Sequence, residues 1–89
     1  MSKILNVEVV TRSETLWSGS ATHVSIPAED GMLGILPGRQ PVLAVLHDGN
    51  VEINGETGGN VSLHVTGGFA SVDVDFVTIV VEEGTKLEA

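Results

Sequence analysis

Three histidines are the residues of this chain best suited to metal or acid–base chemistry: His23, His47 and His64. Imidazole is a common ligand for zinc and iron, and its charge changes near neutral pH. However, no two of these histidines lie two or four residues apart with a carboxylate beside them, which is the spacing that a metal site favours. His23 and His64 also occupy polar positions of alternating segments, which favours side chains that face solvent. A small metal-dependent β-barrel enzyme is therefore an alternative hypothesis only.

Other polar groups lack the context that catalysis needs. Asp73 and Asp75 flank Val74 between two strand-like segments, which is typical of a hairpin turn rather than of a calcium loop. No serine lies in the Gly-x-Ser-x-Gly elbow of a serine hydrolase. The glycines of GMLGILPG, residues 31–38, are not followed by the Lys-Ser or Lys-Thr pair of a phosphate-binding loop. We therefore expect a protein that is not an enzyme, with no catalytic residues, no cofactor and no metal.

The composition argues against several classes of partner. Twelve acidic and four basic residues give a formal charge of −8, which opposes contact with nucleic-acid phosphates and with anionic lipid. The chain has no cysteine, which removes disulfides and thiolate zinc sites. No apolar run approaches the roughly 20 residues that cross a membrane. We expect no nucleic-acid partner and no direct lipid insertion, so any link to a membrane must go through another protein.

The elements that must position these residues are strands. Apolar and polar residues alternate with a period of two in residues 5–9, 22–26, 51–53 and 61–65. Residues 76–81 are more continuously apolar, as in a central strand covered on both faces or lying at an interface. Glycine-containing turn signals separate these segments at short intervals. The 89 residues therefore predict one all-β domain, a sandwich or flattened barrel with mostly antiparallel neighbours.

One stretch, DGMLGILPGRQPVL at residues 30–43, interrupts its apolar residues with glycine and proline. Gly31 and Gly34 permit unusual dihedrals or a close approach of backbone, and Gly38 permits a sharp turn. Pro37 and Pro41 prevent a continuous strand ladder. The pattern predicts a loop with two corners that holds apolar side chains between them, a shape suited to a partner surface.

Together with TLWSG at 15–19, VSIPAEDG at 24–31 and VTGGFASV at 65–72, this loop resembles the amino-terminal domain of the epsilon subunit of the proton-transporting rotary ATP synthase, called delta in mitochondria. The similarity runs from Leu5 to Glu83. It implies a flattened β-sandwich of about ten short strands in residues 1–84. It also implies a tail, residues 85–89, where the family's two carboxy-terminal helices would begin. Those inhibitory helices are expected to be absent, whereas on composition alone the tail is helix-friendly or a solvated terminus.

The resemblance further implies a function and a location. The family member is a non-catalytic subunit of the central stalk, or rotor, that binds the gamma subunit and contacts the c-ring. It helps to couple proton translocation to ATP synthesis. The implied location is peripheral, on the cytoplasmic face of a bacterial inner membrane. An alternative from another class is a free-standing β-sandwich that binds peptides or sugars.

Contact residues also follow from the resemblance. The segment that faces the c-ring in the family corresponds here to Glu29, Asp30, Gly31, Met32 and Arg39. Arg39 stands where the family commonly has His, and Met32 where a polar or acidic residue is frequent. The segments near the gamma subunit correspond to Thr11, Val77, Ile79 and Val81. Trp17 lies in such a segment as well, and it either joins that contact or fills the core.

Overall fold

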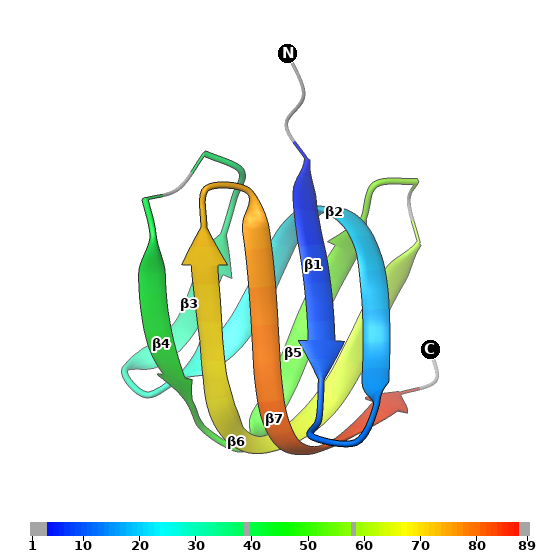
Figure 1. The fold of residues 1–89 in the computed structure, drawn as a ribbon, viewed down its shortest axis with the longest axis vertical. Helices are drawn as coiled ribbons and strands as arrows, with labels where there is room; N and C mark the ends of the chain where they lie inside the picture. Colours follow the sequence, from blue (N-terminus) through cyan, green and yellow to red (C-terminus); the bar gives the residue numbers. More distant parts are fainter. Residues whose placement is uncertain (1–3, 39, 58, 88–89) are drawn as a thin grey trace.

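The computed structural model describes residues 4–38, 40–57 and 59–87, and Figure 1 shows their arrangement. Every regular element in these ranges is a strand. The strands are β1 (Leu5–Val10), β2 (Thr15–Ala28), β3 (Gly31–Ile35), β4 (Val42–Leu46), β5 (Gly49–Gly55), β6 (Asn60–Asp73) and β7 (Phe76–Leu87). The all-β fold expected from the period-two alternation is confirmed.

The strands form two layers that share their longest members. One layer follows the order β1-β7-β6-β4, and the other contains β3, β2, β5 and the first half of β6. β1 pairs with β2 as well, so the layers are joined along that side. The pairing of β1 with β7 is parallel, and all other pairings are antiparallel. The result is a flattened sandwich with the mostly antiparallel character that the sequence predicted.

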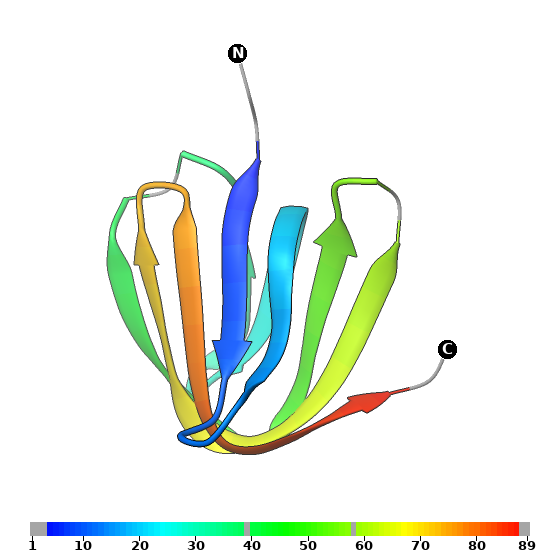
Figure 2. The ribbon, with the colours of Figure 1, turned by 45° about the vertical axis from the view of Figure 1, so that its right-hand side comes forward.

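The strands are fewer and longer than expected. The resemblance implied about ten short strands, whereas the described residues form seven, of which β2 and β6 have 14 residues each and β7 has 12. These long strands bend and continue from one layer into the other (Figure 2). β7 also reaches Leu87, which pairs with Ser62, so residues 85–87 extend the sheet. Residues 88–89 of the expected tail lie outside the described residues.

The bend in β6 falls at two adjacent glycines. Gly67 has a φ of 67° and Gly68 a φ of 129°, values that side chains with a Cβ rarely adopt. A Cβ on Gly68 would overlap the Val80 carbonyl oxygen and lie 2.8 Å from Val81 Cα. Residues before the bend pair with β5, and residues after it pair with β4. Glycine therefore permits both the turn of β6 and its close approach to β7.

The core lies between the two layers and is almost entirely aliphatic. In β1, Leu5, Val7 and Val9 are buried while Asn6 and Glu8 are exposed, as the alternation predicted. Buried residues of the other strands complete the core, among them Val24, Ile26, Ile35, Val51, Ile53, Leu63, Val65, Ala70 and Val72. No buried polar or charged residue occurs within the described ranges. Burial of apolar area at roughly 25 cal/mol per Å² is thus the main stabilising contribution.

Candidate partner-binding surfaces

The hairpin between β2 and β3 carries most of the residues expected to face the c-ring. Glu29 and Asp30 form its exposed tip, Gly31 has a φ of 122°, and the Met32 side chain is 62% exposed. The Glu29 amide donates to the Val45 carbonyl oxygen at 3.0 Å. These contacts present two carboxylates to solvent from a tip whose backbone is bonded to β4.

The turn after β4 supports the same tip. The ring nitrogen Nε2 of His47 lies 3.0 Å from the Glu29 carbonyl oxygen, and the His47 amide donates to the Pro27 carbonyl oxygen at 2.8 Å. His47 therefore has a structural contact, which sequence reasoning missed because its partner lies 18 residues away.

The two-cornered loop is attached to the hairpin between β6 and β7. Gly38, with a φ of 84°, donates its amide to Asp75 Oδ1 at 3.0 Å. The Asp75 carbonyl oxygen accepts from the Asn6 amide at 2.7 Å. Asp75 thus joins three segments of the chain, a role that its position in a turn did not reveal. Arg39 lies outside the described residues.

The remaining loop-shaping residues have individual positions. β3 ends at Ile35 and β4 starts at Val42, so Pro37 and Pro41 both lie between strands. Gly34 pairs with Ser25 inside β3, and a Cβ there would meet His23 Nε2 at 3.2 Å. Gly34 therefore leaves room for the imidazole of His23.

The residues of β7 that were expected to contact the gamma subunit point into the core. Val77, Ile79 and Val81 are 1%, 0% and 3% exposed, so their side chains belong to the core and are not available to a partner. This corrects the sequence-based assignment. The continuous apolar run did not reveal that one face of β7 is buried and the other half-exposed, because successive side chains of a strand alternate.

Thr11 belongs to a tight turn between β1 and β2. Its Oγ1 accepts from the amides of Ser13 and Glu14, each at 3.2 Å, and its own amide donates to the Glu14 carbonyl oxygen at 2.8 Å. These bonds give Thr11 a structural role in the hairpin. Trp17 packs partly against the core and remains partly exposed, so it contributes to the core while part of its ring stays at the surface.

The outward positions of the β1-β7-β6-β4 layer form an apolar row. Val10 pairs with Val80, Val80 with Phe69, and Phe69 with Val45. Directly opposed residues of neighbouring strands have Cβ atoms about 5 Å apart, so the four side chains are contiguous. Val45 is 53% exposed and Phe69 46%, while Val10 and Val80 are half-buried. We call these four residues the apolar stripe.

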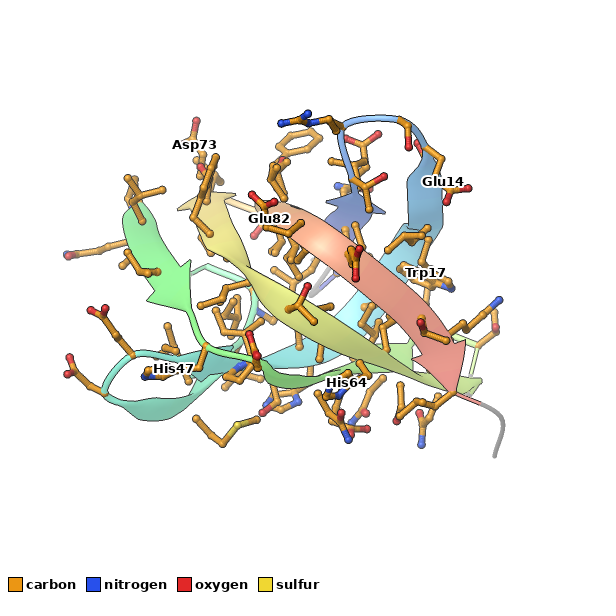
Figure 3. All side chains as sticks on the ribbon, turned by 90° about the horizontal axis from the view of Figure 1, so that it is seen from below. Glu14, Trp17, His47, His64, Asp73 and Glu82 are labelled. Atoms are coloured by element: carbon orange, nitrogen blue, oxygen red, sulfur yellow. The ribbon has the colours of Figure 1, made fainter. Side chains whose placement is uncertain are left out.

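The opposite face of the sandwich is polar. His64 Nδ1 lies 3.0 Å from Asn50 Oδ1, and the Ser62 hydroxyl donates to a Glu52 carboxylate oxygen. Figure 3 shows His64 at this face and His47 near the β2–β3 hairpin, well apart. Within the described ranges, no three His, Asp or Glu side chains gather as metal ligands would. The three histidines thus provide no common site for the metal-enzyme alternative.

These features define a class of protein. A small all-β sandwich with an aliphatic core, an apolar stripe on one face and an acidic hairpin tip has surfaces of the kind by which small domains bind partners. No helix in the described part of the chain has the length and apolar character that crossing a membrane requires.

The family follows from comparison with known proteins. Residues 4–86 match the family model described as ATP synthase, Delta/Epsilon chain, beta-sandwich domain. The chain therefore belongs to this family, as the four sequence motifs indicated.

Curated relatives agree with this assignment. The chain is 49% identical to the ATP synthase epsilon chain of Micrococcus luteus over 75 residues, which are 84% of this chain and 82% of that protein. It is 45% identical over 69 residues to the ATP synthase epsilon chain 2 of Ralstonia nicotianae, covering 78% of this chain and 50% of that protein. For the Streptomyces griseus epsilon chain the identity is 40% over 82 residues, and the coverages are 92% and 66%. The chain thus spans between half and four-fifths of these relatives.

Solved structures share the fold. A chain in the cryo-EM structure of the Euglena gracilis mitochondrial ATP synthase, OSCP/F1/c-ring, superposes with a TM-score of 0.89 at 22% identity, covering 97% of this chain and 55% of that one. A chain of the Tetrahymena thermophila mitochondrial ATP synthase central stalk and c-ring gives 0.72 at 16% identity, with coverages of 91% and 65%. These two matches establish the β-sandwich architecture.

Proposed function

We propose that this chain is a non-catalytic rotor subunit of an ATP synthase, which binds the gamma subunit and contacts the c-ring. In this role it helps to couple proton translocation to ATP synthesis. Membership of the delta/epsilon family and 49% identity to an ATP synthase epsilon chain support the assignment. The location that follows is peripheral, on the cytoplasmic face of a bacterial inner membrane.

The apolar stripe is the observation that carries the gamma contact. Phe69 and Val45 lie beside one another, and each side chain is about half exposed. Leaving such apolar side chains in contact with water is unfavourable. A partner that covers them gains roughly 25 cal/mol for each Å² of apolar area removed from solvent. Leu43 and Phe76, 70% and 63% exposed, are outward-facing residues of the same layer and enlarge the surface. In β7 the gamma contact thus uses outward-facing side chains such as Phe76 and Val80, and not the buried Val77, Ile79 and Val81.

The hairpin tip supports the c-ring contact. Glu29 and Asp30 are exposed at one end of the sandwich, and none of the described residues that line the hollow beside them is basic. Carboxylates held in this way favour a basic partner surface and guide its approach. The hydrogen bond from the Glu29 amide to the Val45 carbonyl oxygen and the contact of His47 with the Glu29 carbonyl oxygen fix the tip, so little ordering is needed on docking.

A binding experiment tests the proposal. The chain is mixed with the gamma subunit of the same organism, and the mass of the complex is measured by size-exclusion chromatography with light scattering. We expect a one-to-one complex that Phe69→Asp abolishes, because the new carboxylate would be buried against an apolar partner. Thr85→Asp is the matched control, since it adds the same charge at an exposed position facing His64 on the polar face. If the unaltered chain forms no complex, or if both variants bind equally well, the proposed gamma contact is wrong.

A further inference from the structure

A pocket opens at the bend of the sandwich, between the turn that joins β1 to β2 and the strands β6 and β7. It is lined by Arg12 from the turn, Gly68 and Phe69 from β6, and residues 80–82 of β7. We call it the bend pocket. Its volume is about 150 Å³, and a protein cavity of roughly this size holds one benzene-sized group. The bend pocket therefore has room for one apolar side chain.

The walls of the bend pocket suit an uncharged occupant. Phe69 is 46% exposed and Val80 is half-buried, so both offer apolar surface to it. Its two charged residues, Arg12 and Glu82, are exposed and carry opposite signs. The methylene groups of an arginine can cover apolar surface while its charged head stays in water. A neutral apolar group fits these walls better than a charged one.

The pocket is a consequence of the bend in β6. Phe69 covers Val80 across the ladder, but the residue opposite Val81 is Gly68, which has no side chain. Gly67 precedes it and has none either, and both glycines have the positive φ that the bend requires. The chain therefore leaves this part of β7 without a neighbouring side chain from β6.

The bend pocket is continuous with the apolar stripe, because Phe69 and Val80 belong to both. A partner that covers the stripe also covers the mouth of the pocket, so it either fills the pocket or leaves a void there. A void loses the dispersion contacts of its lining. Side chains seated in pockets of an interface contribute most to binding. The partner at the stripe is thus expected to place an apolar side chain in the pocket.

Charge argues against a second copy of this chain as that partner. Each copy carries a net charge of −8, and Glu82 and its neighbour Glu83 are both exposed. Two copies that met at this surface would bring like charges together. Figure 3 shows Glu82 on the side of the sandwich away from His47 and His64, so the pocket is also separate from the polar face.

We propose that the bend pocket receives one apolar side chain of the gamma subunit, about the size of leucine or phenylalanine, as the anchor of the contact at the apolar stripe. This inference rests on the proposed function, because gamma is the partner proposed to cover the stripe. It adds one defined binding position to that contact.

Two substitutions at neighbouring positions test the anchor. Glu82→Trp places an indole at a residue that lines the pocket. Glu83→Trp is the matched control, because it makes the same change at an exposed residue that is not among the described residues of the lining. We expect Glu82→Trp to bind gamma at least about tenfold more weakly than Glu83→Trp, because the indole takes the place of the side chain from gamma or overfills the site. Thermal melts of both variants verify that they fold.

A single thiol gives a direct readout of coverage. The chain has no cysteine, so Glu82→Cys and Thr85→Cys each carry one thiol, the first at the pocket and the second on the polar face. We expect gamma to slow the reaction of the Glu82→Cys variant with a maleimide at least about tenfold, because a covered thiol reacts only when the contact opens. The Thr85→Cys variant is expected to slow less than about twofold.

The outcomes separate this inference from the proposed function. Equal or tighter binding by Glu82→Trp than by Glu83→Trp would overturn the anchor, and so would an unchanged reaction rate of the Glu82→Cys variant. If Phe69→Asp still abolished the complex in that case, the proposed function would stand alone. A dimer of the unaltered chain that Glu82→Trp dissociates would assign the pocket to a second copy and overturn the inference. If the unaltered chain failed to bind gamma, both proposals would be overturned.

Discussion

Gly68→Ala tests how the sandwich is built, because it adds one carbon at the bend of β6. With a φ of 129°, Gly68 has a backbone conformation that alanine adopts only with strain. The added Cβ would also overlap the Val80 carbonyl oxygen and lie 2.8 Å from Val81 Cα. Both atoms belong to the backbone of β7, whose ladder with β6 and β1 restricts any movement. The substitution therefore combines conformational strain with a steric clash.

The expected cost is the sum of these two contributions. Strain at such a dihedral costs about 1–2 kcal/mol, and forcing an extra carbon into a packed site costs about 1–3 kcal/mol. A total of about 3 kcal/mol lowers the melting temperature of a domain of this size by roughly 12–24 °C. That is a large share of the roughly 5–15 kcal/mol by which domains are stable.

Gly31→Ala separates the two contributions. Gly31 has a nearly equal φ of 122°, but an added Cβ would meet no atom within 4 Å. It is therefore expected to lose only the strain, about 1–2 kcal/mol. Urea and thermal unfolding followed by circular dichroism measure both free energies of unfolding. Equal losses in the two variants would refute the reasoning that close approach to β7 requires glycine at position 68.

Three further predictions concern a turn, the core and the acidic tip. Val74→Asn is expected to raise the free energy of unfolding by about 1 kcal/mol in urea, because a β-branched residue is strained at a φ of 58°; a lower value would contradict this. Ile79→Ala is expected to lower the free energy of unfolding by about 3–4 kcal/mol, since the Ile79 side chain is fully buried. Thr78→Ala, at the next position and facing outward, is expected to lower it by less than about 1 kcal/mol. A larger loss for Thr78→Ala in thermal melts would contradict the inward orientation of Ile79. Glu29→Lys combined with Asp30→Lys is expected to leave the melting temperature within a few degrees but to weaken co-sedimentation with c-ring proteoliposomes, and undiminished co-sedimentation would count against the c-ring contact.

Local periodicity predicted much of the fold. The alternating segments 5–9, 51–53 and 61–65 lie in β1, β5 and β6, with their apolar residues inward as expected, apart from half-buried Val61. The turn at Asp73 to Asp75 was also predicted, because short polar residues between two apolar runs favour a hairpin. The resemblance implied about ten short strands, whereas the described residues form seven, and a period-two pattern does not mark where one strand bends into the next layer instead of ending.

The candidate surfaces were harder to predict. A continuous apolar run such as residues 76–81 has no polar phase to reveal its exposed side, and the resemblance selected Val77, Ile79 and Val81, which are buried. The roles of His47 and Asp75 were missed because each bonds a segment distant in sequence. Such partners are fixed by how the strands pair and not by neighbouring residues.

The sequence by itself determined the all-β class, the inward face of most strands, the acidic surface and, through four motifs, the family. These properties depend on composition, on the two-residue repeat of a strand and on short runs of glycine and proline. Only the tertiary structure decided that Val10, Val45, Phe69 and Val80 form one stripe and that the bend pocket opens beside it. Both features arise from the register between strands that are far apart in the chain. That register is set by burial of the common core and not by neighbouring residues.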